Sequence, residues 1–279
     1  MRHPRPVAPS ALLALACSLP AQAQDEAAGL PLWEAGVFAA GLSSPAYPAS
    51  NQQVQRGLLL PFVVYRGAVL RADRNGVGAR MLQTERVELD LGFSGALPAS
   101  SNDVAQRQGM PDLGTLLEFG PRAKLQLARP APDQRLSLEL PLRAVLEFGG
   151  GVRQVGYALE PKLAYAWGMG QGWRLKGALS AVLGDQDLNQ YFYGVPQAYA
   201  TPGRPAYTAQ AGLIATRLTL DGVTPLTPDI NLFAYARYDW HQGSANQASP
   251  LFAQDHGSTF GLGLSWTLGR SQARAPSDR

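Results

Sequence analysis

Two pairs of polar residues are placed where they could activate a water molecule. Asp185 and Asp187 are two positions apart, and so are Asp239 and His241. Residues two apart on a β-strand share one face, so both pairs could look into one cleft at a strand end. Facing carboxylates and an imidazole can act as general bases on water. The sequence therefore offers these four residues as candidate catalytic groups of a surface hydrolase.

Little else in the sequence supports an enzyme. The two pairs resemble the arrangement in omptin proteases, but no further omptin-like feature is recognisable. His256 lies near Ser258, at a spacing that is typical of no Ser/His catalytic geometry. There is no glycine-rich phosphate loop, zinc spacing or calcium loop, and Gly149 to Gly151 are better interpreted as a hairpin turn. We therefore expect a non-catalytic protein without metal or cofactor.

The composition indicates which elements carry these residues. The chain has 279 residues, with 30 glycines and 22 prolines scattered without a fixed period, which excludes collagen and a simple helix bundle. Its longest apolar run, Ala11 to Cys17, is far shorter than the roughly 20 residues that a membrane-spanning helix needs. A β protein rich in turns is expected.

The first residues are typical of an export signal. Arg2 and Arg5 precede an apolar stretch, and the small residues before Gln24 predict cleavage after Ala23. We interpret residues 1–23 as a signal peptide. The single cysteine, Cys17, leaves a lipoprotein signal as an alternative. Cleavage would leave 22 basic and 21 acidic side chains, so no nucleic-acid partner is implied.

Most of the remaining chain alternates apolar and polar residues with period two. The stretch Leu136 to Phe148 places apolar residues on one face and Ser137, Glu139, Arg143 and Glu147 on the other. A sandwich core could not accept those ions cheaply, whereas lipid outside and a polar lumen inside suit both faces. The pattern predicts an all-β fold, an antiparallel transmembrane β-barrel in the bacterial cell outer membrane.

A soluble β-sandwich or lipocalin-like barrel is the alternative, because alternation by itself does not exclude it. The placement of aromatic residues favours the membrane barrel. They fall near the ends of their segments on the apolar face, where outer-membrane barrels carry interfacial girdles. The residues concerned are Tyr165, Trp167, Trp173, Tyr238, Trp240 and Trp266.

The segments predict about twelve strands, with ten as an alternative because 68–74 and 77–83 are weak. The expected strands are 33–42, 56–65, 68–74, 77–83, 86–94, 115–127, 135–148, 155–168, 172–184, 206–217, 230–241 and 258–268. Long connections then fall on the outer side and short turns on the inner side, with both termini periplasmic. The barrel would span residues 24–268, followed by a short basic periplasmic tail, 269–279.

The predicted lumen contains balanced charges. Seven acidic residues point inward, Glu88, Asp90, Glu118, Glu139, Glu147, Glu160 and Asp239, against seven basic ones, Arg122, Lys124, Arg143, Lys162, Arg174, Lys176 and Arg237. A pore selective for one sign would show rings of that sign. A balanced interior instead favours an ion-pair network that narrows or plugs the lumen. A narrow solute channel remains an alternative.

Four ordered blocks of sequence then stand out. The first, 65–80, includes Tyr65, Arg66, Gly67, Arg71 and Asp73. The second runs through Gly109, Met110, Pro111 and Asp112 to 121, and the third includes Tyr191, Gly194, Arg204, Pro205 and Tyr207. The fourth lies within 238–260. Together they resemble the MltA-interacting protein family, also called MipA/OmpV, although His241 and Ser244 stand where leucine and aspartate are expected.

The resemblance implies an outer-membrane protein. The family's founding member is described as a scaffold that joins a lytic transglycosylase to a bifunctional penicillin-binding protein during growth of peptidoglycan (murein), and other members as immunogenic or adhesive surface proteins. We therefore expect a scaffold or surface-exposed envelope protein, with membrane lipid and those two enzymes as partners. The glycines and prolines of the blocks suit turns, so we expect the motifs to shape loops rather than to contact a ligand.

Overall fold

The computed structural model describes residues 30–275, except 67–69, 74–75, 85, 97–99, 102–103 and 171, and it leaves the side chains of 70–83, 93, 94 and 96 undescribed. The expected signal peptide, 1–23, therefore lies outside the described residues. No helix among the described residues is long and apolar enough to cross a membrane.

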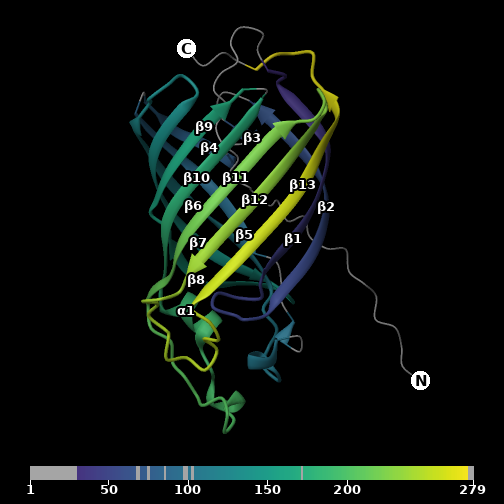
Figure 1. The fold of residues 1–279 in the computed structure, drawn as a ribbon. Coiled ribbons are helices and arrows are strands. Elements are labelled where there is room, and N and C mark those ends of the chain that lie inside the picture. Colours follow the sequence, from purple (N-terminus) through teal and green to yellow (C-terminus); the bar gives the residue numbers. More distant parts are fainter. Residues whose placement is uncertain are drawn as a thin grey trace, which may run out of the picture.

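The described chain forms one closed antiparallel barrel (Figure 1). Its strands are β1 (Trp33–Pro45), β2 (Gln53–Arg66), β3 (Leu70–Asp73), β4 (Gly76–Gln83), β5 (Val87–Ala96), β6 (Thr115–Ala128), β7 (Gln134–Phe148), β8 (Val152–Leu159), β9 (Lys162–Met169), β10 (Trp173–Gly184), β11 (Gly212–Pro225), β12 (Ile230–Trp240) and β13 (His256–Arg270). β13 pairs with β1, and β10 pairs with β11. Closure matters because backbone groups in hydrocarbon must be paired within the protein.

The thirteen strands occupy twelve positions around the wall. β8 and β9 both pair with β7 and β10, so they form one passage that is interrupted at Glu160 and Pro161. β3 has only four residues, whereas a tilted strand needs about 9–11 to cross a bilayer. The segments 68–74 and 77–83, whose strand pattern in the sequence is weak, therefore correspond to a short hairpin, β3–β4, between longer strands.

The outer surface carries the apolar residues of the alternation. Leu59, for example, is 72% exposed and Leu262 is 64% exposed. Trp33 and Trp173 begin strands at one rim, and Trp240 ends a strand at the other, all with exposed rings. This is the arrangement expected for side chains that face lipid and its two interfaces.

Two predicted boundaries are wrong. The strand expected at 206–217 is β11, Gly212–Pro225, because residues 185–211 fold as the helix α1 (Gln186–Tyr193), a short 3-10 helix (Gln197–Tyr199) and loops. Asp185 caps the helix by accepting a hydrogen bond from the Leu188 N–H. The last strand, expected at 258–268, is β13, His256–Arg270.

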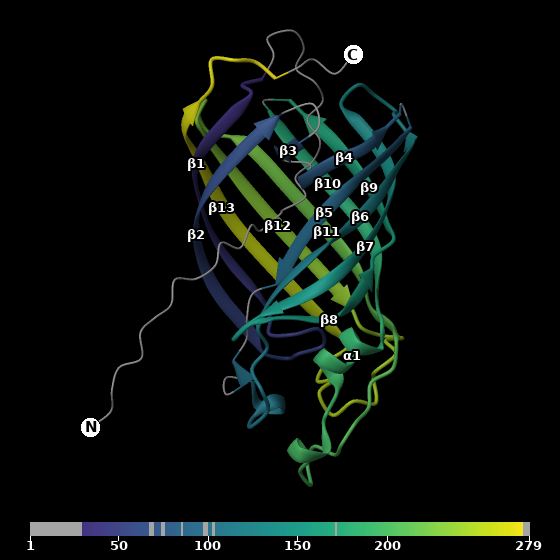
Figure 2. The same cartoon turned by 180° about the vertical axis from the view of Figure 1, so that it is seen from behind.

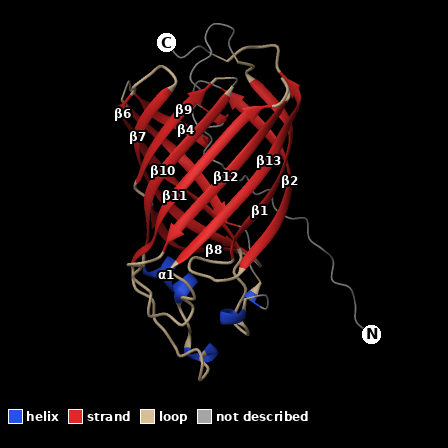
Figure 3. Cartoon of the chain, viewed as in Figure 1, coloured by secondary structure: helices blue, strands red, loops and turns tan. Residues whose placement is uncertain are grey.

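The two ends of the barrel differ (Figure 3). Short connections, 84–86, 129–133, 170–172 and 226–229, lie at one rim, where the Ala275 N–H also donates to the Leu30 carbonyl. Longer connections, 46–52, 97–114, 185–211 and 241–255, gather with α1 at the other end. Outer-membrane barrels have short periplasmic turns and long outer loops, so the described ends of the chain lie at the periplasmic rim.

Candidate functional site

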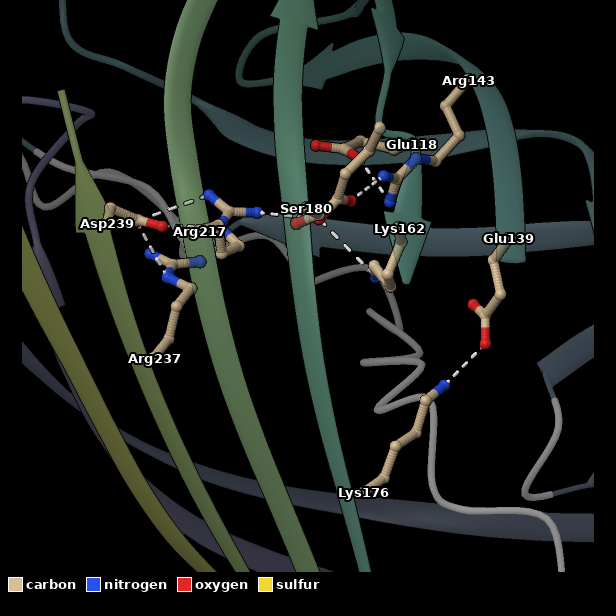
Figure 4. Close-up of polar contacts among 10 residues, drawn as sticks. Glu118, Glu139, Arg143, Lys162, Lys176, Ser180, Arg217, Arg237 and Asp239 are labelled. Carbon is tan, nitrogen blue, oxygen red and sulfur yellow. Dashed lines mark hydrogen bonds and ion pairs between the residues drawn. The ribbon is translucent and has the colours of Figure 1, made fainter. Parts of the chain in front are cut away.

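The first candidate site is a network of charged side chains inside the barrel (Figure 4). Asp239 on β12 accepts a hydrogen bond of 2.7 Å from Arg217 Nε on β11, and Arg237 Nε lies 3.1 Å from its other oxygen. Arg217 also reaches Glu160 Oε1, with its Nη1 at 3.6 Å. One guanidinium on β11 therefore bridges two carboxylates, that of Asp239 on β12 and that of Glu160 at the break between β8 and β9.

Glu160 is the centre of this network. It stands at the interruption between β8 and β9, and its carboxylate accepts hydrogen bonds from Arg143 on β7 and from Ser180 Oγ, at 2.9 Å, on β10. Lys162 Nζ lies 3.6 Å from the same carboxylate. Arg143 continues the chain of charges to Glu118 on β6, at 3.1 Å. The broken strand thus places one acid among cations from several strands.

Two further ion pairs extend the network around the wall. Lys176 Nζ on β10 donates to Glu139 on β7 at 2.9 Å. On the neighbouring strands before β7, Arg122 of β6 donates to both oxygens of Asp90 on β5, at 2.9 and 2.5 Å. These pairs are buried, and removing one partner of a buried pair is costly because the other charge is left without compensation. The interior is therefore cross-linked by charge.

The sequence analysis missed two members of this interior. Arg217 and Asp221 lie on the inward face of β11, but the expected strand was placed too early for Asp221 to belong to it. The missed signal is the alternation of Leu218 and Leu220 with Arg217, Thr219 and Asp221. The described residues contain no group of three or more acidic, histidine or cysteine side chains that could hold a metal ion.

The candidate hydrolase residues do not form one cleft. Asp185 is the N-cap of α1 and Asp187 lies in its first turn, so they are not neighbours on one strand face. Asp239 is bound by two arginines within the network. His241 is buried, accepts a hydrogen bond from the Ala49 N–H and, through Nδ1, bonds the Ile214 carbonyl. Both ring nitrogens are therefore engaged with backbone.

The second candidate site is the outer cap, which we define as the packed loops 46–52, 104–114, 185–211 and 241–255. Arg204 holds two of these loops together, since its guanidinium donates to the carbonyls of Gln106, Gln108 and Tyr199. Tyr207 OH donates to Asn246 at 3.2 Å. Residues of the third and fourth sequence blocks, and the loop just before the second block, therefore meet in one structure.

The second block closes the cap against the barrel. Met110 is buried with Tyr47 and Leu251 in an apolar cluster, and Gly109, at φ 77°, makes the turn before it. Pro111 and Asp112 hold Ser101, whose Oγ donates to the Pro111 carbonyl and whose N–H donates to the Asp112 carboxylate. These contacts order the loop before β6.

The third block fastens α1 to the wall. Tyr191 OH donates to Glu147 Oε1 at 2.8 Å and accepts from the Gly114 N–H at 3.0 Å. Gly194 ends the helix, and a Cβ there would come within 1.9 Å of the Gln190 side chain. Pro205 lies in the same loop, between Arg204 and Tyr207. The tight geometry explains why a side chain could not replace this glycine.

Burial shifts the pKa values of groups in the outer cap. Desolvation, followed by the hydrogen bond to Glu147, raises the pKa of Tyr191, and desolvation raises the pKa of Tyr47 to about 12. Desolvation also lowers the pKa of His241, against the opposing effect of its bond to Ile214. Both tyrosines and the histidine are therefore neutral hydrogen-bonding groups at pH 7.

The first block lies at the periplasmic rim. Arg66 donates to Glu34 and to the Pro31 carbonyl, and thereby ties the end of β2 to the start of the described chain. Tyr65 is partly exposed on the outer surface beside it. Arg71 and Asp73 are on β3, but their side chains and Gly67 lie outside the described residues.

The closed barrel, its lipid-facing apolar surface and its loop-capped outer end define an outer-membrane β-barrel protein. The chain belongs to the MipA family, because the family model described as MltA-interacting protein MipA matches residues 37–268.

Solved structures with a similar fold are also outer-membrane barrels. The NanC porin has a TM-score of 0.40 and 10% identity, over 83% of this chain and 100% of that chain. Outer membrane phospholipase A from Escherichia coli has a TM-score of 0.36 and 12% identity, over 87% of this chain and 93% of that chain. Likeness at such identity concerns the fold alone. No curated protein matches the sequence.

Proposed function

We propose that this protein is a non-catalytic scaffold of the outer membrane, which holds a murein hydrolase of the lytic transglycosylase class close to a murein synthase of the penicillin-binding class. The observation that carries the proposal is the family match over residues 37–268, since the family is named for an interaction with MltA. Exposure of the protein at the cell surface is compatible with this role, because the outer cap faces away from the periplasm.

Two structural features support a scaffold over a solute channel or an enzyme. Ion pairs along the inner wall join β5 to β6 and β7 to β10, and the outer cap packs around buried side chains such as Tyr193 and Leu251. The four candidate hydrolase residues serve as a helix cap, a helix residue, an ion-pair partner and a loop support. A wall whose polar side chains are already ion-paired or hydrogen-bonded suits a scaffold protein.

A partner in the periplasm would meet the rim with the short turns. Exposed Arg129 lies on the turn between β6 and β7, and exposed Arg270 ends β13 beside Asp229. Murein enzymes could contact this rim without entering the barrel. Because the rim charges are solvent-exposed, their pairs add little to the stability of the barrel, and they can be replaced with little effect on folding.

The test is a pull-down from detergent-solubilised envelopes with the full-length tagged protein. We expect the wild type to retain a lytic transglycosylase and a penicillin-binding protein, and a double variant, Arg129→Ala with Arg270→Ala, to retain less. Arg153→Ala is the matched control, since its exposed guanidinium lies at the outer end, where it contacts Glu147. Recovery of neither enzyme by the wild type, from cross-linked cells as well, would overturn the proposal.

A further inference from the structure

Two arginines stand where the barrel opens to the periplasm. Arg135 is the second residue of β7 and Arg174 is the second residue of β10, and both strands begin at the rim with the short turns. Glu139 and Lys176, which share a strand face with them, form an ion pair inside the barrel. Because residues an even number of positions apart on a strand point the same way, both arginines face the lumen. Two guanidinium groups therefore lie at its periplasmic mouth.

These two arginines differ from other cations of the inner wall. Arg135 and Arg174 form no side-chain ion pair or hydrogen bond with the described residues, and Arg174 Nε is buried without a partner. Buried polar atoms usually have a hydrogen-bond partner, so this donor is available to an incoming acceptor. The cations that do pair with carboxylates are Arg122, Lys124, Arg143, Lys162, Lys176, Arg217 and Arg237.

The two arginines are close enough to bind one group together. β9 lies between β7 and β10 (Figure 2), with Ala166 opposite Arg135 and Gly168 opposite Arg174. From the spacing of strands and of residues along them, the two arginine Cα atoms are on the order of 12 Å apart. Since Ala166 and Gly168 are small, no long side chain of β9 stands between the guanidinium groups. Both can therefore approach one anion from opposite sides.

The surroundings of the pair are positive. Arg129, on the turn before β7, is close enough to Arg135 to repel its charge, whereas Glu88 attracts it. Glu88 is already shared with a lysine of β6, at 3.8 Å. Asp133, on the same turn as Arg129, is exposed and forms no ion pair with the described residues. Arg129, Arg135 and Arg174 thus outnumber the one unshared acid, which favours an anionic ligand.

The inward direction of the pair limits what can bind there. A folded protein domain meets the exposed rim, whereas the inner face of the wall is reached only by a narrow group, such as the end of an extended peptide. A guanidinium binds a carboxylate through two parallel hydrogen bonds, which gives strength as well as orientation. Murein lies in the periplasm, and its short stem peptides carry free carboxylates.

We propose that Arg135 and Arg174 bind a carboxylate of a murein stem peptide at the periplasmic mouth of the barrel. The choice of murein among carboxylate ligands rests on the proposed scaffold function. Murein then becomes a direct ligand of the protein, in addition to the enzymes that act on it. The scaffold would hold those enzymes beside a strand of their own substrate.

Titration of the purified full-length protein in detergent with a soluble muropeptide tests the proposal. The probe is a murein disaccharide with its tetrapeptide, and the control ligand is the same compound with its carboxylates amidated. Isothermal titration calorimetry measures both affinities. We expect the free acid to bind and the amidated compound not to bind. Binding should weaken as salt is added, because charges at the mouth are screened.

Substitutions at the mouth should change the affinity in opposite directions. Arg135→Gln and Arg174→Gln should each weaken binding by about tenfold, the effect of losing one charge-assisted hydrogen bond. Asp133→Asn should strengthen it by about threefold, because a negative charge near the incoming carboxylate is removed. Asp133 Oδ2 lies 3.3 Å from where a Cβ on Gly168 would stand, so it is close to the proposed site. Damage to the fold could not produce this gain.

Arg153→Gln is the matched control, since Arg153 pairs with Glu147 at the outer end of the barrel. Its affinity for the muropeptide should equal that of the wild type. Heat-modifiable migration on gels shows that each variant forms the barrel.

Three results would overturn the proposal. Equal binding of the free and amidated muropeptides would show that no carboxylate is recognised, and unchanged affinity in both glutamine variants would place the ligand elsewhere. Inorganic phosphate that binds as tightly as the muropeptide and displaces it would identify a general anion site. The titration contains no enzyme and leaves Arg129 and Arg270 intact, so its failure and a failed enzyme pull-down are separate outcomes.

Discussion

At the scale of single residues, His241 shows how one buried side chain joins distant loops. It accepts from Ala49 in one outer loop and bonds Ile214 at the start of β11, while lying in a third segment of the cap. Such a histidine must be neutral, because a protonated ring could not accept the Ala49 hydrogen bond. The cost of burying a charge is the reason its pKa is lowered.

His241 therefore predicts that the outer cap weakens in acid. Its pKa is about 6.5 in the unfolded chain and lower in the folded one, so the unfolded state binds more protons between these two values. The stabilisation is complete above about pH 6.5 and falls as the pH drops toward the folded value, by at most about 1.4 kcal/mol per pH unit. Hydrogen exchange at the Ala49 amide, expressed relative to its intrinsic rate at each pH and compared between pH 7.5 and 5, measures this loss of stabilisation.

Two variants control this experiment. His241→Leu should make the protection of the Ala49 amide, its exchange rate relative to the intrinsic rate at the same pH, nearly independent of pH in this range, at the expense of a weaker cap at pH 7.5. His256→Ala, which removes an exposed histidine outside the cap's interior, should keep the wild-type dependence. An unchanged pH dependence in His241→Leu would show that another group is responsible.

At the scale of elements, α1 depends on the strand against which it packs. Gly156 on β8 has φ 137°, and a Cβ there would come within 2.4 Å of Asp185 Oδ1 and 2.5 Å of the Leu188 nitrogen. Asp185 and Leu188 are the two partners of the N-cap hydrogen bond. The absence of a side chain at Gly156 thus lets the first turn of the helix lie directly on the wall.

We expect Gly156→Ala to detach the start of α1. The alanine would suffer both the collision and the positive φ, together costing roughly 1–3 kcal/mol. Faster proteolysis within 185–211, with the barrel still resistant, measures the effect. Gly57→Ala is the control, since a Cβ at Gly57 meets nothing within 4 Å. Equal protease resistance of Gly156→Ala and wild type would contradict the packing argument.

At the scale of the whole molecule, ion pairs link strands that are far apart in the sequence. Arg217 and Asp239 of β11 and β12 connect through Glu160 to Arg143 of β7 and Glu118 of β6. Cations and anions alternate along this chain, so no ring of one sign lines the lumen. Together with the outer cap, the network predicts a barrel that does not pass ions freely.

Planar-bilayer recording of the purified protein measures this property directly. We expect no stable conductance steps from the wild type, because the ion pairs and the cap obstruct the lumen. Arg143→Gln with Glu160→Gln removes two linked charges at the centre of the network and should make brief openings more frequent. Stable steps in the wild type would favour the narrow channel over the plugged scaffold.

The sequence by itself determined the barrel, because a strand between lipid and a hydrated lumen must alternate its side chains. Leu136 to Phe148 shows this pattern, and β7 follows it. Local signals could not determine α1 or the start of β11, since Asp185 acts as a helix cap only when β8 leaves room at Gly156. This error also concealed the inward position of Asp221.

Only the tertiary structure decided which charges meet. Period two assigns Glu160 and Arg217 to faces, but their contact depends on strand register and on the break between β8 and β9. The physical reason is that side-chain alternation is local, whereas pairing between strands depends on backbone geometry over long separations in the chain.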